Sequence, residues 1–222
     1  MGVSPPRGAR RARSPESKQE RAASLLEAAR SLAAEQGVAS VTLTAIAERA
    51  GLHHSAMRRY YASYREVLLH LAAEGWSRWS ARVNEELADH GPVSPAGLAA
   101  VMADALAADP LFCDLLANVP LHLEHEVPAA RVLEFKQATT PAIAAMTRAI
   151  VRHGPGLNHQ QALDAVTAAN ALSATLWQVS HPSPELARAY QAEPGLALIQ
   201  VDDFQATLTR LLAATCAGLA AQ

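Results

Sequence analysis

The sequence predicts an all-α protein built as a bundle of helices. Three observations predict it: apolar residues recur at intervals of three, four and seven, alanine is abundant, and strict alternation of apolar and polar residues is hard to find. With 222 residues, 50% hydrophobic and 18% charged, the chain has enough apolar content to bury a core. Its apolar runs are too interrupted to span a membrane, so the composition excludes both a disordered and a transmembrane protein.

The amino-terminal residues carry most of the positive charge. Residues 1–16 contain three prolines and four arginines and almost no apolar residue, which predicts a disordered basic arm. Residues 1–70 hold 11 Lys and Arg against 6 Asp and Glu, a net +5, whereas residues 71–222 hold 8 against 15, a net −7. This asymmetry is typical of a protein that binds a polyanion, although an ordinary solvated arm gives the same pattern.

Two helices are predicted directly after the arm. From Ser17 to about Gln36 the apolar residues share one helical face, and Gly37 is placed to end that helix. Thr42 suits the N-cap of a second helix that continues to about Ala50. Gly51 suits the left-handed turn that ends this second helix.

A third helix of about two turns is predicted over residues 53–61, with Met57 and Tyr61 on its buried side. A helix, a tight turn containing glycine and a second helix form the geometry that places the second helix in a DNA major groove. A plain helical hairpin inside a bundle would explain the apolar pattern equally well. It would not explain why a helix too short to stabilise itself carries two adjacent arginines outward in the net-positive part of the chain. The outward-facing side chains of this helix are His54, Ser55, Arg58 and Arg59.

Four motifs follow one another between residues 18 and 75. They are AAEQG at the end of the first helix, VTLTAIAERAGL, the pair Tyr60-Tyr61, and Ser63 with Glu66 three residues later, which is also a capping box. In this order and spacing the chain resembles the tetracycline-repressor (TetR) family of transcriptional regulators. The resemblance implies a helix-turn-helix DNA-binding domain over residues 17–63, a helical effector-binding and dimerisation domain over residues 64–222, and a homodimer on a palindromic double-stranded DNA operator.

The recognition segment departs from the family pattern. This chain reads HHSAMR where many members have Ser, then Lys or Pro, then Gly-Thr-Leu-Tyr, so Arg58 replaces a tyrosine that commonly binds phosphate. Arginine can hold a phosphate or read guanine. His53 stands where a Ser or Thr cap is usual, which predicts a less well capped helix. We expect His54, Ser55 and Arg59 to meet base edges, and the phosphates to be met by Thr42, Arg58, Tyr60 and Arg65.

Glycine and proline divide the remaining residues. A long helix is predicted from Tyr64 to about His90, closed by Gly91. Asp109-Pro110 is expected to open a short helix, and residues 154–156 to end another. Residues 182–195 are predicted to be a loop. The last two helices are predicted at His159–Ser180 and Asp203–Ala220.

The resemblance implies an effector cavity and a dimer interface in this acidic part of the chain. The side chains expected to line the cavity are Trp79, Met102, Phe112, Leu116, His122, Phe135, Met146 and Trp177. The small and apolar residues expected at the dimer interface lie on the last two helices: Ala162, Val166, Ala169, Ser173, Phe204, Leu208, Leu211, Leu212 and Thr215. Composition alone leaves an internal core as the alternative for both sets.

Other classes of protein are less well supported. His122 and His125 lie three residues apart near two glutamates, yet a further metal ligand is lacking, so we expect no metal and no cofactor. Motifs of hydrolases, nucleotide-binding enzymes and zinc proteases are missing, and a helical enzyme using these histidines stays an alternative. So does a partner-binding or membrane-surface adaptor with a basic arm. Two distant cysteines, Cys113 and Cys216, predict a reducing cytoplasm.

The function that the sequence favours is therefore a DNA-binding transcriptional regulator, most simply a repressor. Its expected partners are the operator, a second copy of the chain and a small apolar or amphipathic effector. We expect the protein neither to catalyse a reaction nor to bind a membrane.

Overall fold

A computed structural model describes residues 15–193, 195, 197 and 200–222, with the side chains of residues 15–17, 54 and 56 outside this description. Every regular element among these residues is helical, which confirms the predicted all-α class. The predicted basic arm lies outside the described residues except for Pro15 and Glu16, which begin the first helix.

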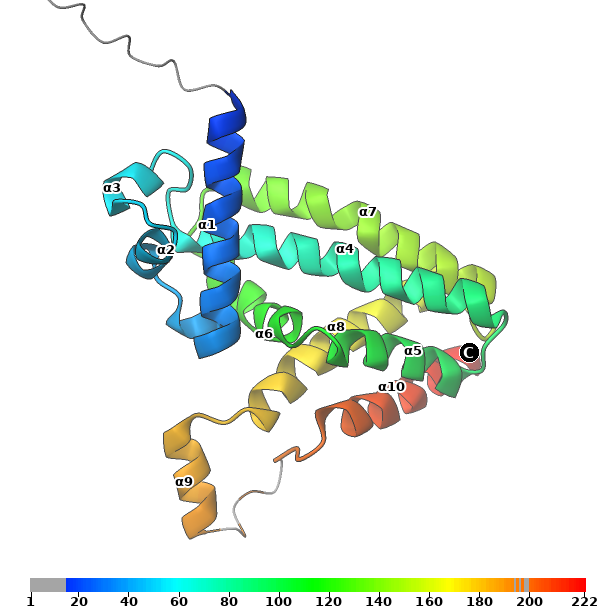
Figure 1. Ribbon diagram of the computed structural model, residues 1–222. Helices are drawn as coiled ribbons and strands as arrows, with labels where there is room; N and C mark the ends of the chain where they lie inside the picture. The colour runs from blue at the N-terminus through cyan, green and yellow to red at the C-terminus, as the bar shows by residue number, and fades with distance from the viewer. Residues whose placement is uncertain (1–14, 194, 196, 198–199) are drawn as a thin grey trace, which may run out of the picture.

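The amino-terminal unit consists of α1 (Pro15–Gln36), η1 (Val38–Ser40), α2 (Leu43–Arg49) and α3 (His54–Met57). Gly37 follows α1 with φ +82°, a left-handed conformation that glycine adopts without strain. The guanidinium of Arg49 donates two hydrogen bonds of 2.8 and 2.7 Å to the carboxylate of Glu35, which fastens α2 to the end of α1. These bonds lower the pKa of Glu35. In Figure 1, α1 runs across the first half of the long helix α4 (Tyr64–His90).

The larger unit is a bundle around α4. Its helices α4 and α7 lie side by side, joined near one end by Arg131 and Glu66 (3.5 Å) and near the other by a hydrogen bond of 2.9 Å from Val93 N–H to the His153 carbonyl. Helix α10 packs against α5 and α8 (Figure 1). The elements after α4 are α5 (Pro95–Ala107), α6 (Pro110–Asn118), the π-helical turn η2 (Val119–Leu123), α7 (Ala129–His153), α8 (His159–Ser180), α9 (Pro184–Ala192) and α10 (Phe204–Ala220).

Most predicted helix ends are confirmed. Ser63 caps α4 by accepting a hydrogen bond of 3.3 Å from Glu66 N–H, and Gly91 follows the helix with φ +69°. The Glu66 carboxylate reaches back one residue further than in the usual capping box and accepts from Ala62 N–H at 2.9 Å. Asp109 caps α6, with Pro110 in its first turn. The two carboxy-terminal helices begin and end within one residue of the predicted positions.

The predicted loop over residues 182–195 is wrong, because it contains α9. The side chain of Ser183 accepts a hydrogen bond of 3.3 Å from Leu186 N–H, and Pro184 occupies the first helical turn. A serine cap followed by proline is a helix-start signal. None of the residues of α9 is buried, and the helix stands away from the bundle in Figure 1.

One apolar core runs through both units. It continues from Leu25 and Ala29 of α1 through α4 to the carboxy-terminal helices. At its centre Trp76, Trp79 and Phe112 pack together, with ring centroids 5.2 to 6.2 Å apart. The amino-terminal helices are therefore packed onto the same core that supports the larger unit.

Both cysteines are buried free thiols in this core. Burial raises the pKa of Cys113 to about 12, with the Asp109 and Asp114 carboxylates adding to the shift, and raises the pKa of Cys216 to about 11. Each thiol therefore stays protonated in the folded chain at neutral pH.

We predict that neither thiol of the native protein reacts readily with Ellman's reagent at pH 8, and that both react once the chain is unfolded. Because an exposed thiol ionises near pH 8.5 and the buried ones do so only at higher pH, the unfolded state loses protons first. The free energy of unfolding should therefore fall as the pH rises above about 8.5. Fast labelling of the native protein, or stability that rises over this range, would contradict the burial.

Candidate functional site

The turn between α2 and α3 has the predicted helix-turn-helix geometry. Thr42 caps α2 by accepting a hydrogen bond of 3.2 Å from Ala45 N–H. Gly51 adopts φ +66°, and the backbone of Leu52 returns to α2 through a hydrogen bond of 2.8 Å to the Ala47 carbonyl. Leu52 packs against the core from this corner. The chain thus reverses within a few residues and presents α3 at the edge of the molecule (Figure 1).

The third helix is shorter than predicted. Helix α3 is a single turn, His54–Met57, and Arg58 and Arg59 lie in the turn that follows it. The N–H groups of Tyr60 and Tyr61 both bond the Met57 carbonyl, at 2.8 and 3.1 Å, which tightens the backbone there. The prediction of two helical turns over residues 53–61 is therefore wrong in length, because the chain bends toward the buried Tyr61.

His53 supplies the cap that the sequence lacks. Its Nδ1 accepts a hydrogen bond of 3.4 Å from Ser55 N–H and lies 2.9 Å from Ser55 Oγ. The imidazole nitrogen thus takes the place of the hydroxyl or carboxylate oxygen of a usual N-cap. The loss of helix stability that the sequence predicts for a missing Ser or Thr cap is offset by this hydrogen bond.

Burial divides this segment into an anchored side and an exposed side. Met57 is fully buried and Tyr61 is nearly so, as predicted. Ser55, Arg58 and Arg59 are exposed. The side chain of His54, which was expected at a base edge, lies outside the described residues. Two arginines and a serine hydroxyl therefore face solvent beside the glycine turn, held there by two buried anchors.

The residues expected at the phosphates have different surroundings. Thr42 is exposed, and its hydroxyl can still donate while its oxygen caps α2. Tyr60 is half-buried and packs against the core. Arg65 is 22% exposed, and its Nη2 lies 2.6 Å from a carboxylate oxygen of Glu126 in the segment before α7. In this conformation Arg65 is therefore committed to another part of the chain.

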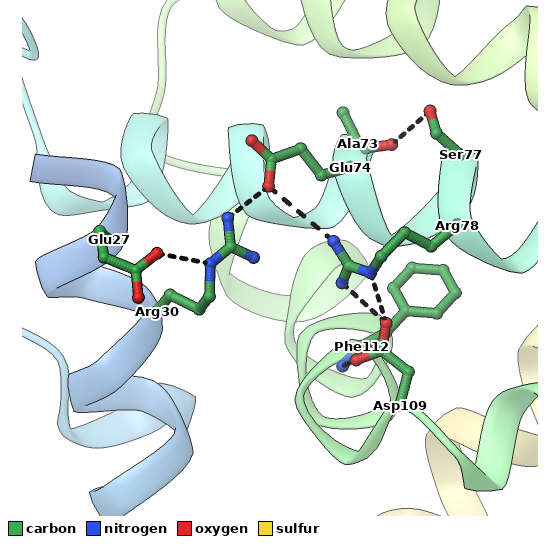
Figure 2. Close-up of polar contacts among 8 residues, drawn as sticks. All are labelled: Glu27, Arg30, Ala73, Glu74, Ser77, Arg78, Asp109 and Phe112. Atoms are coloured by element: carbon green, nitrogen blue, oxygen red, sulfur yellow. Dashed lines mark hydrogen bonds and ion pairs between the residues drawn. The ribbon is translucent and has the colours of Figure 1, made fainter. Parts of the chain in front are cut away.

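A network of ion pairs joins the amino-terminal unit to the bundle. Figure 2 shows Arg30 of α1 donating a hydrogen bond of 2.7 Å to Glu74 of α4, and Arg78 of α4 donating one of 2.7 Å to Asp109, the cap of α6. Glu74 lies 3.9 Å from Arg78 and so connects the two pairs. The hydrogen bond to Glu74 raises the pKa of the Arg30 guanidinium. The network ties α1, α4 and α6 to one another.

A second link between the two units runs through Asp114 of α6. Its Oδ2 accepts a hydrogen bond of 2.7 Å from the backbone N–H of Val38 in η1, and Val38 is almost fully buried. Its Oδ1 lies 3.2 Å from Asn118 Nδ2 and 3.4 Å from Gln178 Nε2. Asp114 therefore links α6 directly to η1 of the amino-terminal unit.

We predict that Asp114→Ala lowers the free energy of unfolding by about 1–3 kcal/mol, because the buried Val38 N–H loses its acceptor. Urea unfolding followed by circular dichroism measures the change. Asp89→Ala, at an exposed position near the end of α4, is the matched control and should lie within about 0.5 kcal/mol of the parent protein. Equal stability of the two variants would show that the Asp114 bond contributes nothing.

A cavity of about 300 Å³ lies among α4, α6, η2, α7 and α8. This volume is at the lower end of the range typical of small-molecule sites. Pro141, inside α7, has no backbone N–H and leaves a gap in the helical hydrogen bonds beside the cavity. The lining side chains come from residues far apart in the sequence: Trp76, Leu116, Val119, Pro120, Glu124, Phe135, Lys136, Thr139, Thr140, Ile143, Leu163, Val166, Thr167 and Asn170.

Only part of the predicted lining surrounds this cavity. Among the residues predicted to line the effector cavity, Leu116 and Phe135 line this one. Trp177 instead lines a groove of about 800 Å³ between α1, α6 and α8, and Trp79 lines a groove of about 560 Å³ beside Arg30 and Arg78. The other predicted lining residues are placed elsewhere: His122 is exposed, and the side chains that are completely buried in the core are Met102, Phe112 and Met146.

The polar lining was missed in the sequence. Glu124 and Lys136 face each other at the cavity, with Nζ 2.6 Å from Oε1. The hydroxyl of Thr140 donates to the Lys136 carbonyl at 2.7 Å, and that of Thr139 does so at 3.3 Å. The spacing of four residues could have indicated this lining. Helical intervals place Lys136, Thr139, Thr140 and Ile143 on one face of α7.

Most of the residues expected at a dimer interface are buried inside the single chain. The small-residue stripe of α8 faces α6 and α10, and Leu208 and Leu212 of α10 point into the same core. A side chain that is already fully covered has no surface to offer a second copy. The covered residues are Ala162, Val166, Ala169, Ser173, Leu208 and Leu212, whereas partial exposure remains at Phe204, Leu211 and Thr215.

Neither metal ligands nor a membrane span stand out in the described part of the chain. His122 and His125 are exposed, and the described residues contain no group of three or more His, Cys, Asp or Glu side chains placed to hold a metal. In the same residues no single helix has the length and apolarity to cross a membrane, and only the bent pair of α5 with α6 and η2 meets that test jointly.

Solved structures of similar shape are regulators. The TetR-family repressor FadR of Thermus thermophilus, in complex with lauroyl-CoA, has a TM-score of 0.56 and 14% identity over 88% of this chain and 93% of that one. RolR in complex with resorcinol has a TM-score of 0.53 and 14% identity over 94% and 97%. A TetR-family regulator of Streptomyces coelicolor has a TM-score of 0.52 and 18% identity over 90% and 99%. At these identities the likeness shows the fold.

Two family models match the sequence itself. Residues 25–71 match bacterial regulatory proteins of the tetR family, and residues 73–222 match the tetracyclin repressor-like carboxy-terminal domain. A search of the curated proteins gave no match at a significant level. Since the two models together span nearly all of the residues from 25 to 222, the chain belongs to the TetR family of transcriptional regulators, which are generally not enzymes.

Proposed function

We propose that this regulator binds a palindromic DNA operator as a homodimer, represses transcription, and changes its operator affinity when a small apolar or amphipathic effector fills the cavity among α4, α6, α7 and α8. One observation carries the proposal: the exposed Ser55, Arg58 and Arg59 stand beside the Gly51 turn, fixed by the buried Met57 and Tyr61. It acts in the cytoplasm, without a cofactor and without catalysis.

The DNA contacts divide into two kinds. Arg59 and Ser55, with His54, read base edges in the major groove, since arginine bonds guanine O6 and N7 together. Arg58, Thr42 and Tyr60 hold the phosphates. Arg65 joins them when it leaves Glu126, so its role depends on the conformation of the segment before α7.

The second copy of the chain packs on the faces of α8 and α10 that the protomer leaves open. Phe204, Leu211 and Thr215 retain part of their surface there, and Ala171 and Thr175 of α8 are exposed. A two-fold axis at this face would set two α3 turns in opposite orientation, as a palindromic operator requires. Light scattering coupled to size-exclusion chromatography should give twice the chain mass.

Effector binding reaches the DNA through α6. This helix lines the cavity through Leu116, carries the Asp114 bond to η1, and is capped by Asp109, which holds Arg78. A change of its position therefore alters the pose of the helix-turn-helix unit. A coupling of about 1–3 kcal/mol would change DNA affinity by about 5–150-fold. The bound lauroyl-CoA of FadR and resorcinol of RolR support a ligand role for a helical domain of this shape.

Selection of bound sequences from a random duplex library tests the proposal. We expect an enriched palindrome whose half-sites lie about one or two helical repeats apart. The variant with Arg58→Ala and Arg59→Ala, selected in parallel, should enrich no motif while remaining dimeric and helical. Enrichment of no sequence by the parent protein, or of the same motif by both proteins, would refute it.

A further inference from the structure

The cavity contains an ion pair whose two members differ in burial. Lys136 has a side chain that is 55% exposed, whereas that of Glu124 is 20% exposed. The oxygen of Glu124 that faces the ammonium, Oε1, is itself buried and receives no well-directed hydrogen bond, although Lys136 Nζ lies 2.6 Å away. The carboxylate therefore has a counter-ion but lacks a properly oriented donor.

The two partners would respond differently to a ligand. Lys136 is a long flexible side chain whose charged end is near water, so it can turn outward at little cost. Glu124 Oε1 is buried beneath the ammonium, and the whole Glu124 side chain is only 20% exposed, so it stays the less hydrated partner when Lys136 moves. An anionic ligand that draws Lys136 away would leave this buried oxygen without a counter-ion, which is costly. A cationic ligand would replace the ammonium of Lys136 and free it to enter water.

The rest of the lining suits the hydrocarbon part of such a ligand. Trp76, Leu116, Phe135 and Ile143 supply apolar walls. The aromatic rings also attract a cation over their faces, as Lys136 Nζ already shows by lying 5.3 Å from the centre of the Phe135 ring. Among the described lining residues the charged side chains are Glu124 and Lys136, so once Lys136 has turned outward the cavity is left with one negative charge.

We infer that the effector is a cationic amphipath, an organic amine whose ammonium group takes the place of Lys136 on Glu124 while its hydrocarbon chain lies against Trp76, Leu116 and Phe135. The regulatory meaning of this site rests on the proposed function. Binding of the amine itself is a property of the larger unit and can be measured without DNA.

Three ligands with the same hydrocarbon chain test the charge preference: octylamine, octanoate and 1-octanol. Each is titrated into the full-length protein at pH 7 by isothermal calorimetry, with tryptophan fluorescence as a second signal because Trp76 lines the cavity. We expect octylamine to bind about tenfold or more tightly than the other two, the range of one charge-assisted hydrogen bond. Octanoate binding most tightly, equal affinities, or no binding of octylamine would overturn the inference.

Two variants separate the roles of the pair. Glu124→Gln should weaken octylamine binding about tenfold or more. Lys136→Met removes the competing ammonium and should strengthen octylamine binding several-fold while leaving the weak octanoate binding unchanged. A lysine that recruits anions would instead make octanoate binding fall in this variant. Glu126→Gln, on the same segment but paired with Arg65 outside the cavity, is the matched control and should leave octylamine affinity unchanged.

Operator binding without ligand is measured on the same protein samples. If Glu124→Gln and Lys136→Met keep the parent's operator affinity and octylamine binding fails the pattern above, the inference about the effector is refuted while the proposed function stands. If neither the parent protein nor any variant binds a selected operator, the proposed function fails. The octylamine titrations do not depend on DNA, so they still decide which ligand charge the cavity prefers.

Discussion

Gly75→Ala should destabilise the protein by about 1–3 kcal/mol, although alanine is the better helix former by about 1 kcal/mol. Gly75 lies inside α4, where a Cβ would stand 2.1 Å from Cδ2 and 2.7 Å from Cγ of Phe112. The Phe112 ring is fully buried between Trp76 and Trp79, so it has no free space to move into. The added methyl group must therefore push α4 and α6 apart or force the ring out of its rotamer.

Urea unfolding of three variants separates overpacking from helix propensity. Gly218→Ala, inside α10 with open space where the Cβ would stand, is the control and should stabilise the protein by up to about 1 kcal/mol. Phe112→Leu removes the clashing ring atoms, so the double variant with Gly75→Ala should lose less than the sum of the two single losses. Additive losses, or a stable Gly75→Ala protein, would show that α4 and α6 are not packed as closely as described.

Arg59→Ala should weaken specific operator binding by about 1–3 kcal/mol, or about 5–150-fold, because a bidentate contact with a guanine is lost. Binding to an unrelated duplex should fall much less. Arg58→Ala should differ: if Arg58 holds a phosphate, both affinities fall by a similar factor and the salt dependence flattens by about one unit.

Fluorescence anisotropy with the selected operator and a scrambled duplex, over a series of salt concentrations, measures both effects. Arg152→Ala is the matched control, because it removes one exposed arginine from the last turn of α7 without touching the helix-turn-helix unit. An equal loss of specific and non-specific affinity in Arg59→Ala would remove its role in reading bases.

Features governed by neighbours in the sequence were predictable. Thr42, Gly51 and Ser63 set helix ends through contacts within four residues, and periodicity placed Met57 and Tyr61 inside. The same local rules explain why a loop was predicted where the structure has α9. Ser183 and Pro184 signal a helix start, but the surrounding proline and glycine residues favoured a loop.

Features set by distant residues were not predictable. Small residues at helical spacing on α8 fit an internal core and a dimer interface equally well, and only the positions of α6 and α10 beside them decide that Ala162 and Ala169 are covered. The partner of Arg65 lies about sixty residues away at Glu126, which no periodicity indicates. The cavity likewise gathers Glu124 and Lys136 from separate elements, so its charge could not be inferred in advance.

Glu74 and Asp114 belong to the bundle but hold residues of the amino-terminal unit, so that unit depends on the bundle for part of its own hydrogen bonding. A fragment cut after Ser63 would lose the acceptor of the Val38 N–H and the carboxylate that holds Arg30, together with the apolar surface of α4 beneath α1. The helix-turn-helix unit is therefore no autonomous module. Heating should melt it together with the bundle in one cooperative step, and grafting it onto a foreign partner would require a substitute for both acidic side chains.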